Sequence, residues 1–79
     1  MEIAKIAAIV TTLNETDGAP ESMLYIFLDM NMDEWQTMRH LLVSNGLITI
    51  KGNYATLTDK GRELAQKLNE ALETSRENE

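Results

Sequence analysis

The sequence predicts an α+β fold with three helices, a two-stranded β-hairpin and a C-terminal helix. Apolar residues recur at helical spacing near both ends of the chain, which predicts amphipathic helices there. Between them, two short apolar segments flank Gly52-Asn53, a dipeptide typical of a two-residue hairpin turn. The 79 residues, 43% of them hydrophobic, are enough for one domain with one core. The lack of cysteine excludes disulfides and cysteine-ligated zinc.

The first helix is predicted over residues 2–13. Its apolar stripe consists of Ile3, Ile6, Val10 and Leu13. Ala8 and Ile9 widen the apolar surface beyond what one small core needs, which makes them candidates for an interface. Residues 14–18 are rich in turn-forming residues and predict a polar loop.

The second helix is predicted to begin at Pro20, because a proline in the first helical turn loses no hydrogen bond. Residues 23–28 are almost wholly apolar, so we expect this helix to lie at the centre of the core. Three or four residues then precede the next helix, which is the length of a helix-turn-helix turn.

The third helix begins with a predicted capping box. The Asn31 side chain can accept from the Glu34 N–H, and the Glu34 carboxylate can accept from the Asn31 N–H. Asn45-Gly46 is a common C-terminal signal and ends the helix. The core side of this helix is expected to consist of Trp35, Met38 and Leu42.

The hairpin is predicted from Leu47–Ile50 and Tyr54–Leu57, and Thr58 is the predicted N-cap of the last helix. The apolar stripe of that helix consists of Leu64, Leu68 and Leu72. The domain is therefore expected to span residues 1–73, followed by a polar, frayed tail over residues 74–79.

This order of elements is typical of a winged helix-turn-helix. The most specific motifs are Asn45-Gly46-Leu47-Ile48 and Tyr54-x-x-Leu57-Thr58-Asp59-Lys60-Gly61, which lie at the right separation. Matching upstream positions are Ser22-Met23-Leu24-Tyr25, Leu28, Trp35, Met38 and Leu42. Over roughly residues 5–72 the chain resembles the small archaeal winged-helix regulators. The resemblance implies a dimeric DNA-binding transcriptional regulator with its third helix in the major groove and its hairpin wing on the neighbouring backbone.

Carried over by position, the resemblance implies eight DNA-binding residues. They are Gln36, Thr37, Arg39 and His40 on the third helix, Lys51 and Asn53 on the wing, and Lys60 and Arg62 in the last helix. Gln36 and Thr37 have hydrogen-bonding groups suited to base edges or phosphates, and Arg39 can pair with a guanine edge or a phosphate. The alternative, that these are ordinary exposed helix residues, stays open.

The net charge of −6 opposes DNA binding, but the charge is unevenly distributed. Residues 1–33 hold one basic and six acidic residues, whereas residues 34–67 hold five basic and three acidic residues. The segment that would face DNA is thus the only positive one. The alternative function is an acidic winged-helix protein–protein interaction module that does not bind DNA.

For either function we expect a homodimer. Its seam is predicted to involve Ala8 and Ile9, or Leu64, Leu68 and Leu72. We expect no enzyme, because the serines lie in no nucleophile motif and a domain this small has little room for a pocket. His40 is the only histidine, so neither a metal nor a cofactor is expected. No membrane span or leader is evident, which makes a cytoplasmic location the default expectation.

Overall fold

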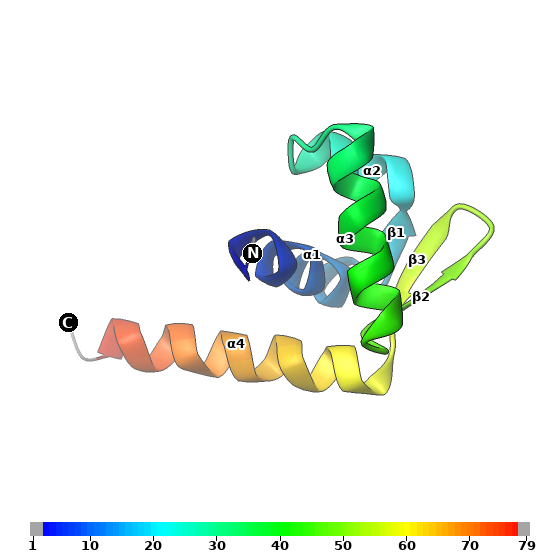
Figure 1. The fold of residues 1–79 in the computed structure, drawn as a ribbon. Coiled ribbons are helices and arrows are strands. Elements are labelled where there is room, and N and C mark those ends of the chain that lie inside the picture. The colour runs from blue at the N-terminus through cyan, green and yellow to red at the C-terminus, as the bar shows by residue number, and fades with distance from the viewer. Residues whose placement is uncertain (1–2, 78–79) are drawn as a thin grey trace.

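The structure is a computed structural model that describes residues 3–77, with the side chains of residues 3–71. In this part of the chain the order of elements is α1 (Ile3–Thr16), β1 (Ala19–Pro20), α2 (Glu21–Phe27), α3 (Met32–Ser44), β2 (Ile48–Lys51), β3 (Tyr54–Leu57) and α4 (Asp59–Glu77) (Figure 1). The predicted α+β order, with a hairpin between the third and last helices, is confirmed. No helix among the described residues is both long and apolar enough to cross a membrane.

The core lies where α1, α2, α3 and the hairpin meet. Its largest fully buried side chains are Trp35, Ile9, Leu13, Leu24, Leu42 and Val10. The predicted core side of α3 is confirmed, because Trp35 and Leu42 are almost completely buried and Met38 is 7% exposed. In α1 the predicted stripe is confirmed at Val10 and Leu13, which are buried, and Ile6 packs against the core. Ile3 is instead 70% exposed, and Ile9 is also in the core.

The prediction that the second helix is central is wrong for most of α2. Leu24 is its only buried residue, whereas Ile26 and Phe27 are 73% and 74% exposed. Tyr25, and Leu28 just after the helix, are partly buried and pack against the core beside Leu24. Its start also differs from the prediction, because Pro20 is the extended N-cap residue and the first helical residue is Glu21.

The sheet has a third strand that sequence reasoning missed. Its order is β1-β3-β2, all antiparallel, and β1 pairs Ala19 with Ala55 and Pro20 with Tyr54. The β1 strand has two residues and contains a proline, which is tolerated at a sheet edge, so the sequence carries no periodic strand signal there. The predicted hairpin is confirmed, with Ile48 opposite Leu57 and Lys51 opposite Tyr54.

The helix caps follow the prediction. In α3 the Glu34 N–H donates to Asn31 Oδ1 at 2.8 Å, and the Asn31 N–H donates to Glu34 Oε1 at 3.2 Å. At the start of α4 the Gly61 N–H donates to Thr58 Oγ1 at 3.1 Å. All three bonds satisfy N–H groups that have no partner inside their own helix.

The last helix is longer than predicted. It does not end near Glu73 but continues to Glu77, so residues 74–77 of the predicted tail are helical, and residues 78 and 79 lie outside the described part. Figure 1 shows that α4 packs beneath α1 at its start and then extends past the N-terminus of α1. Charged residues spaced along a helix do not by themselves end it, and no glycine or proline follows Gly61.

Candidate nucleic-acid interface

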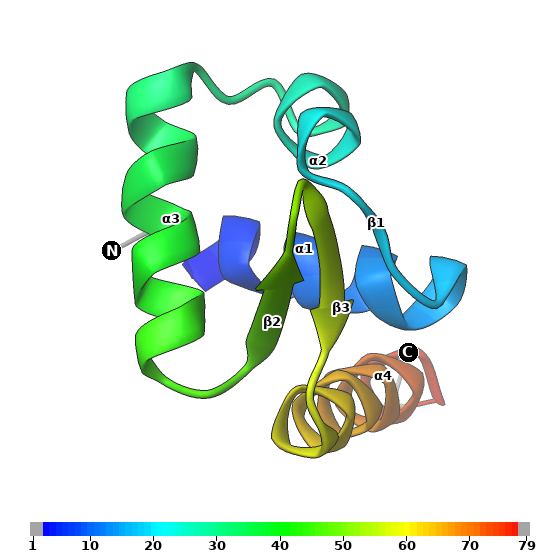
Figure 2. The same ribbon diagram turned by 90° about the vertical axis from the view of Figure 1, so that its right-hand side faces the viewer.

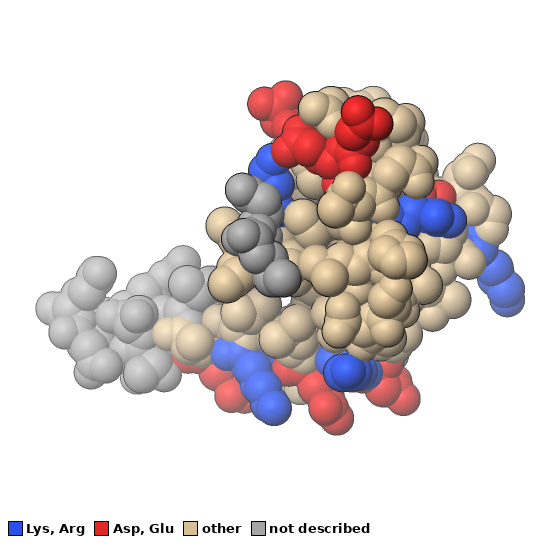
Figure 3. Space-filling model, in the orientation of Figure 1, with Lys and Arg blue, Asp and Glu red and all other residues tan. Residues whose placement is uncertain are grey.

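The outward side of α3 beyond its first turn consists mostly of neutral polar side chains, with Val43 also exposed. Gln36, Thr37 and His40 are exposed, as predicted for the side that would face DNA. The Thr37 hydroxyl donates to the Asp33 carbonyl oxygen at 3.1 Å, which leaves its lone pairs available for a further donor. The space-filling view places acidic side chains above this surface and none over the middle of α3 (Figure 3).

Arg39 lies on the same helix but is held by an acidic side chain of α2. Its Nε is 2.8 Å from Glu21 Oε1, and its side chain is 38% exposed. The contact has the distance of an ion pair without the geometry of a hydrogen bond, since no acceptor is aligned with that N–H. The same Glu21 oxygen accepts from the indole N–H of Trp35 at 3.0 Å. Arg39 is therefore positioned beside the core instead of reaching freely into solvent.

Glu21 is a residue of this surface that sequence reasoning missed. Its carboxylate contacts α3, and its backbone N–H donates to the Asn53 carbonyl oxygen in the hairpin turn at 2.7 Å. It thereby connects α2, α3 and the hairpin at one point. No local signal could have identified it, because its partners lie 14, 18 and 32 positions further along the sequence.

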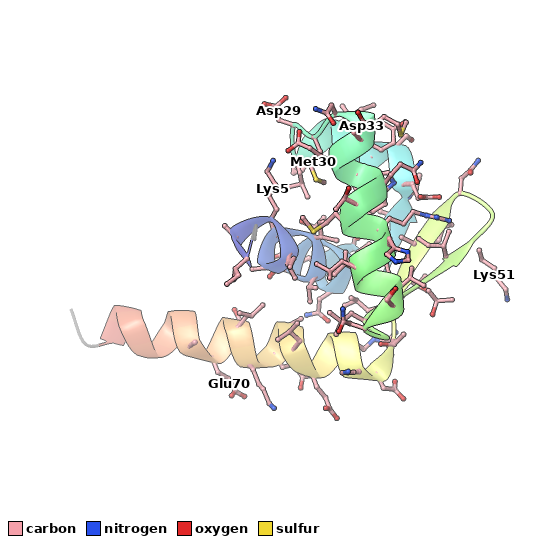
Figure 4. The ribbon with its side chains drawn as sticks, in the orientation of Figure 1. Lys5, Asp29, Met30, Asp33, Lys51 and Glu70 are labelled. Carbon is pink, nitrogen blue, oxygen red and sulfur yellow. The ribbon has the colours of Figure 1, made fainter. Side chains whose placement is uncertain are left out.

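The hairpin provides the exposed cation of the interface. Lys51 is at the end of β2 and points away from the body of the molecule (Figure 4). The next residue, Gly52, has a φ of +62°, as a tight hairpin turn requires, and Asn53 is exposed beside it. Among the described side chains Lys51 forms no ion pair, so its ammonium group is available to a phosphate.

A hollow separates α3 from the hairpin. It has a volume of about 390 Å³ and is lined by Arg39, His40, Val43, Ile48, Thr49 and Ile50. Figure 2, which looks onto the hairpin, shows α3 and the hairpin side by side. Of the predicted DNA-binding residues, this hollow brings together Arg39 and His40. Gln36 and Asn53 line a second hollow, and Thr37 lines a third with Lys5 and Asp33.

Lys60 and Arg62 both contact other groups of the same chain. The Lys60 ammonium donates to the Asn45 carbonyl oxygen at 3.0 Å, at the C-terminal end of α3. Arg62 lies 3.8 Å from Asp17 and 3.7 Å from Asp59. The loop that contains Asp17 and helix α3 are on opposite sides of the hairpin in Figure 2, so the structure does not bring Arg62 beside the α3 residues.

Acidic residues collect at the N-terminal end of α3. Asp33 is in the first turn of α3, Asp29 precedes that helix in the connecting loop, and Lys5 of α1 points toward the same end (Figure 4). The Lys5 ammonium binds Glu34 Oε2 at 2.8 Å. That hydrogen bond, the Asn31 N–H and the charge of Lys5 together lower the pKa of Glu34. These carboxylates make the first turn of α3 acidic, whereas residues 35–44 contain no acidic residue.

The residues predicted for a dimer seam are spread between the core and the surface. Ile9 is fully buried within the chain, which removes it from a seam, and Ala8 is half-buried. Leu64 and Leu68 are half-buried on α4, and the side chain of Leu72 lies outside the described residues. Among the described residues, no group of three or more side chains could hold a metal ion.

Comparison with known proteins assigns the fold. A family model described as winged helix-turn-helix matches residues 2–76. The chain belongs to the winged helix-turn-helix family. Its structure is also similar to the transcriptional regulator homologue protein from Pyrococcus horikoshii OT3, with a TM-score of 0.81 and 20% sequence identity, covering 96% of this chain and 83% of that chain. No curated protein matches the chain.

Proposed function

We propose that this winged-helix chain is a DNA-binding transcriptional regulator that places α3 in the major groove and the hairpin on the adjacent backbone. The observation that carries the proposal is the charge arrangement on α3. Its two acidic residues are both in the first turn, and residues 35–44 contain none. An exposed row of neutral hydrogen-bonding side chains beside an unpaired lysine is suited to base edges and phosphates.

Each side chain of this surface has a distinct proposed role. Gln36 and His40 read base edges, and Thr37 contacts a base edge or a phosphate through its hydroxyl oxygen. Arg39 contributes the free side of its guanidinium while Glu21 fixes the other side. Lys51 and the side-chain amide of Asn53 bind the DNA backbone. The Lys60 ammonium, which binds the carbonyl oxygen of Asn45 after the C-terminal end of α3, is the outermost residue of the proposed contact.

The proposed complex depends weakly on salt. The slope of log K against log salt concentration grows with the number of neutralised phosphates. Each chain has one unpaired lysine and a partly neutralised arginine on this surface, so the slope should be shallow. Binding to random sequence should be weak for the same reason.

A homodimer is part of the proposal, with two copies of α3 presented to one DNA duplex. The last helix supports it, because its 19 residues, about 28 Å in length, extend beyond the body of the chain (Figure 1). Leu64 and Leu68 keep part of their surface exposed on this helix. Light scattering at micromolar concentration should give twice the chain mass, and a monomer would contradict the dimer.

The function is tested by fluorescence anisotropy of a labelled duplex at two salt concentrations, with three proteins. Wild type should bind, and Lys51→Glu should bind about tenfold more weakly at the lower salt concentration, because a backbone cation becomes an anion. Lys67→Glu is the matched control: it makes the same charge change at another exposed lysine, on α4, which forms no ion pair with a described side chain. Its affinity should stay within twofold of the wild-type value.

Two outcomes would contradict the proposal. If Lys51→Glu and Lys67→Glu weaken binding equally, only the total charge matters and the hairpin is not in contact with DNA. If wild type does not bind even at low salt, the acidic protein–protein interaction module becomes the better description of the chain.

A further inference from the structure

The outward side of α2 carries large apolar side chains that nothing in the described chain covers. Met23, Ile26 and Phe27 are 46%, 73% and 74% exposed. Their spacing of three and four residues places them on one side of the helix. Contiguous exposed apolar residues of this size are typical of interaction sites, whereas single ones are common on any surface.

A groove adjoins these side chains. It lies between the C-terminal half of α1 and α2, with a volume of about 160 Å³. The lining residues are Thr12, Glu15, Thr16, Met23, Leu24, Phe27 and Leu28. The groove is large enough to seat one large apolar side chain, with Ile26 and Phe27 on the adjoining surface. We call the groove together with Met23, Ile26 and Phe27 the α2 surface.

Two carboxylates adjoin the α2 surface. Glu15 lines the groove, and Asp29 follows the C-terminal end of α2, where its N–H donates to the Ile26 carbonyl oxygen. Neither carboxylate forms an ion pair with a described side chain. The only basic residue between positions 3 and 33 is Lys5, which binds Glu34 on α3. A ligand that complements this surface is therefore apolar at its centre and basic at its rim.

We propose that the α2 surface binds a basic amphipathic helix of a partner protein. An incoming helix presents apolar residues at positions i, i+3 and i+4, which match a groove between two helices beside a row of apolar residues. Lysine or arginine residues flanking that row would meet Glu15 and Asp29. The α2 surface shares no residue with the α3–hairpin hollow, so the partner helix and DNA can be bound together.

The proposal is tested with labelled synthetic peptides and the full chain in the absence of DNA. One peptide is helix-forming, with an apolar stripe of leucines flanked by lysines. A second replaces the lysines with glutamates, and a third keeps the basic composition but scrambles the stripe. The first should bind more tightly than both others, and its affinity should fall as salt increases.

Matched variants locate the peptide. Phe27→Ala should weaken binding about tenfold, as expected for an apolar anchor, whereas Ile3→Ala removes an equally exposed side chain from α1 and should change little. Glu15→Lys should weaken binding several-fold at low salt. Glu70→Lys, which makes the same charge change on α4 (Figure 4), should not.

Four results would overturn the proposal. The first is no binding of the basic peptide at all. The second is equal binding of the basic and acidic peptides, since the rim would then have no role. The third is an equal loss of affinity with Phe27→Ala and Ile3→Ala. The fourth is a wild-type oligomer that Phe27→Ala dissociates, because a second copy of the chain would then occupy the α2 surface. None of these results depends on DNA binding.

Discussion

The two helices of the helix-turn-helix unit differ in what they show to solvent. The α3 helix has 13 residues, buries Trp35, Met38 and Leu42, and presents neutral polar side chains outward. The α2 helix has seven residues, buries Leu24 alone, and presents Ile26 and Phe27 outward. Apolar content therefore does not locate a helix in the core. The unit therefore exposes two surfaces of different chemistry, a polar one on α3 and an apolar one on α2.

The largest expected effect is on stability, and it compares a buried with an exposed aromatic side chain of the helix-turn-helix unit. Trp35 is 1% exposed and Phe27 is 74% exposed. Trp35→Ala should lower the free energy of unfolding by about 3–5 kcal/mol, through lost packing and the resulting cavity. Phe27→Ala should change it by less than about 0.5 kcal/mol. Urea unfolding measures both, and similar losses in the two variants would show that α2 is buried against the body of the chain.

The next effect concerns the junction that places the hairpin beside α3. Gly61 is buried, and a Cβ there would overlap the Leu47 carbonyl oxygen and lie 2.9 Å from Leu57 Cδ2. Gly61→Ala should therefore cost about 1–3 kcal/mol of stability. Gln66→Ala, an exposed position on the same helix, is the control and should be nearly neutral. A neutral Gly61→Ala would mean that α4 does not approach Leu47 this closely.

A smaller effect on stability and on DNA affinity is expected from the first turn of α3. Asp33 lies in its first turn, where a negative charge stabilises the helix by about 0.3–1 kcal/mol but repels phosphates. Asp33→Asn should thus reduce stability slightly and tighten DNA binding, by roughly fivefold at low salt. Thermal unfolding and anisotropy would show these opposite changes. Unchanged affinity would place the N-terminal end of α3 away from the duplex.

The smallest effect comes from Glu34, whose pKa is lowered by the Lys5 ammonium and the Asn31 N–H. A carboxyl group with a lowered pKa in the folded state contributes stability at every pH above its pKa in the unfolded chain. That stabilisation is lost as the pH falls through the lowered pKa of the folded state. Glu34→Gln keeps the capping box but not the charge. Its melting temperature should be slightly below wild type at pH 7, and the difference should disappear as the pH falls through the lowered pKa of Glu34 in the folded state. A gap that persists in acid would show that capping, not charge, is responsible.

Much of the fold was predictable because its signals are local. The capping box at Asn31, the Gly52-Asn53 turn and the Thr58 cap each depend on a few neighbouring residues, and all three are confirmed. The position of α2 was not predictable, because an apolar run indicates a helix without saying which of its sides is covered. The short β1 strand has no signal apart from its partner β3.

The candidate site was predictable only in part. Exposure of Gln36, Thr37 and His40 follows from helical periodicity once Trp35 is assigned to the core. The neutralisation of Arg39 by Glu21 does not follow from the sequence, because it depends on how α2 crosses α3. Arg62 is similar, because it lies beside two carboxylates. Asp59 is three residues away on the same helix and could be inferred from the sequence, whereas Asp17 lies in the α1–β1 loop and could be identified only from the folded structure.

The measurement that tests the central claim most directly is a pair of amide chemical-shift titrations of the same ¹⁵N-labelled chain. With duplex DNA, the account predicts shifts at Gln36, His40 and Lys51 and none at Ile26 and Phe27; with the basic amphipathic peptide, it predicts the reverse. Separate sets of shifts would establish two surfaces. Shifts at Ile26 and Phe27 with DNA, or at Gln36 and Lys51 with the peptide, would contradict the division of the helix-turn-helix unit into two surfaces.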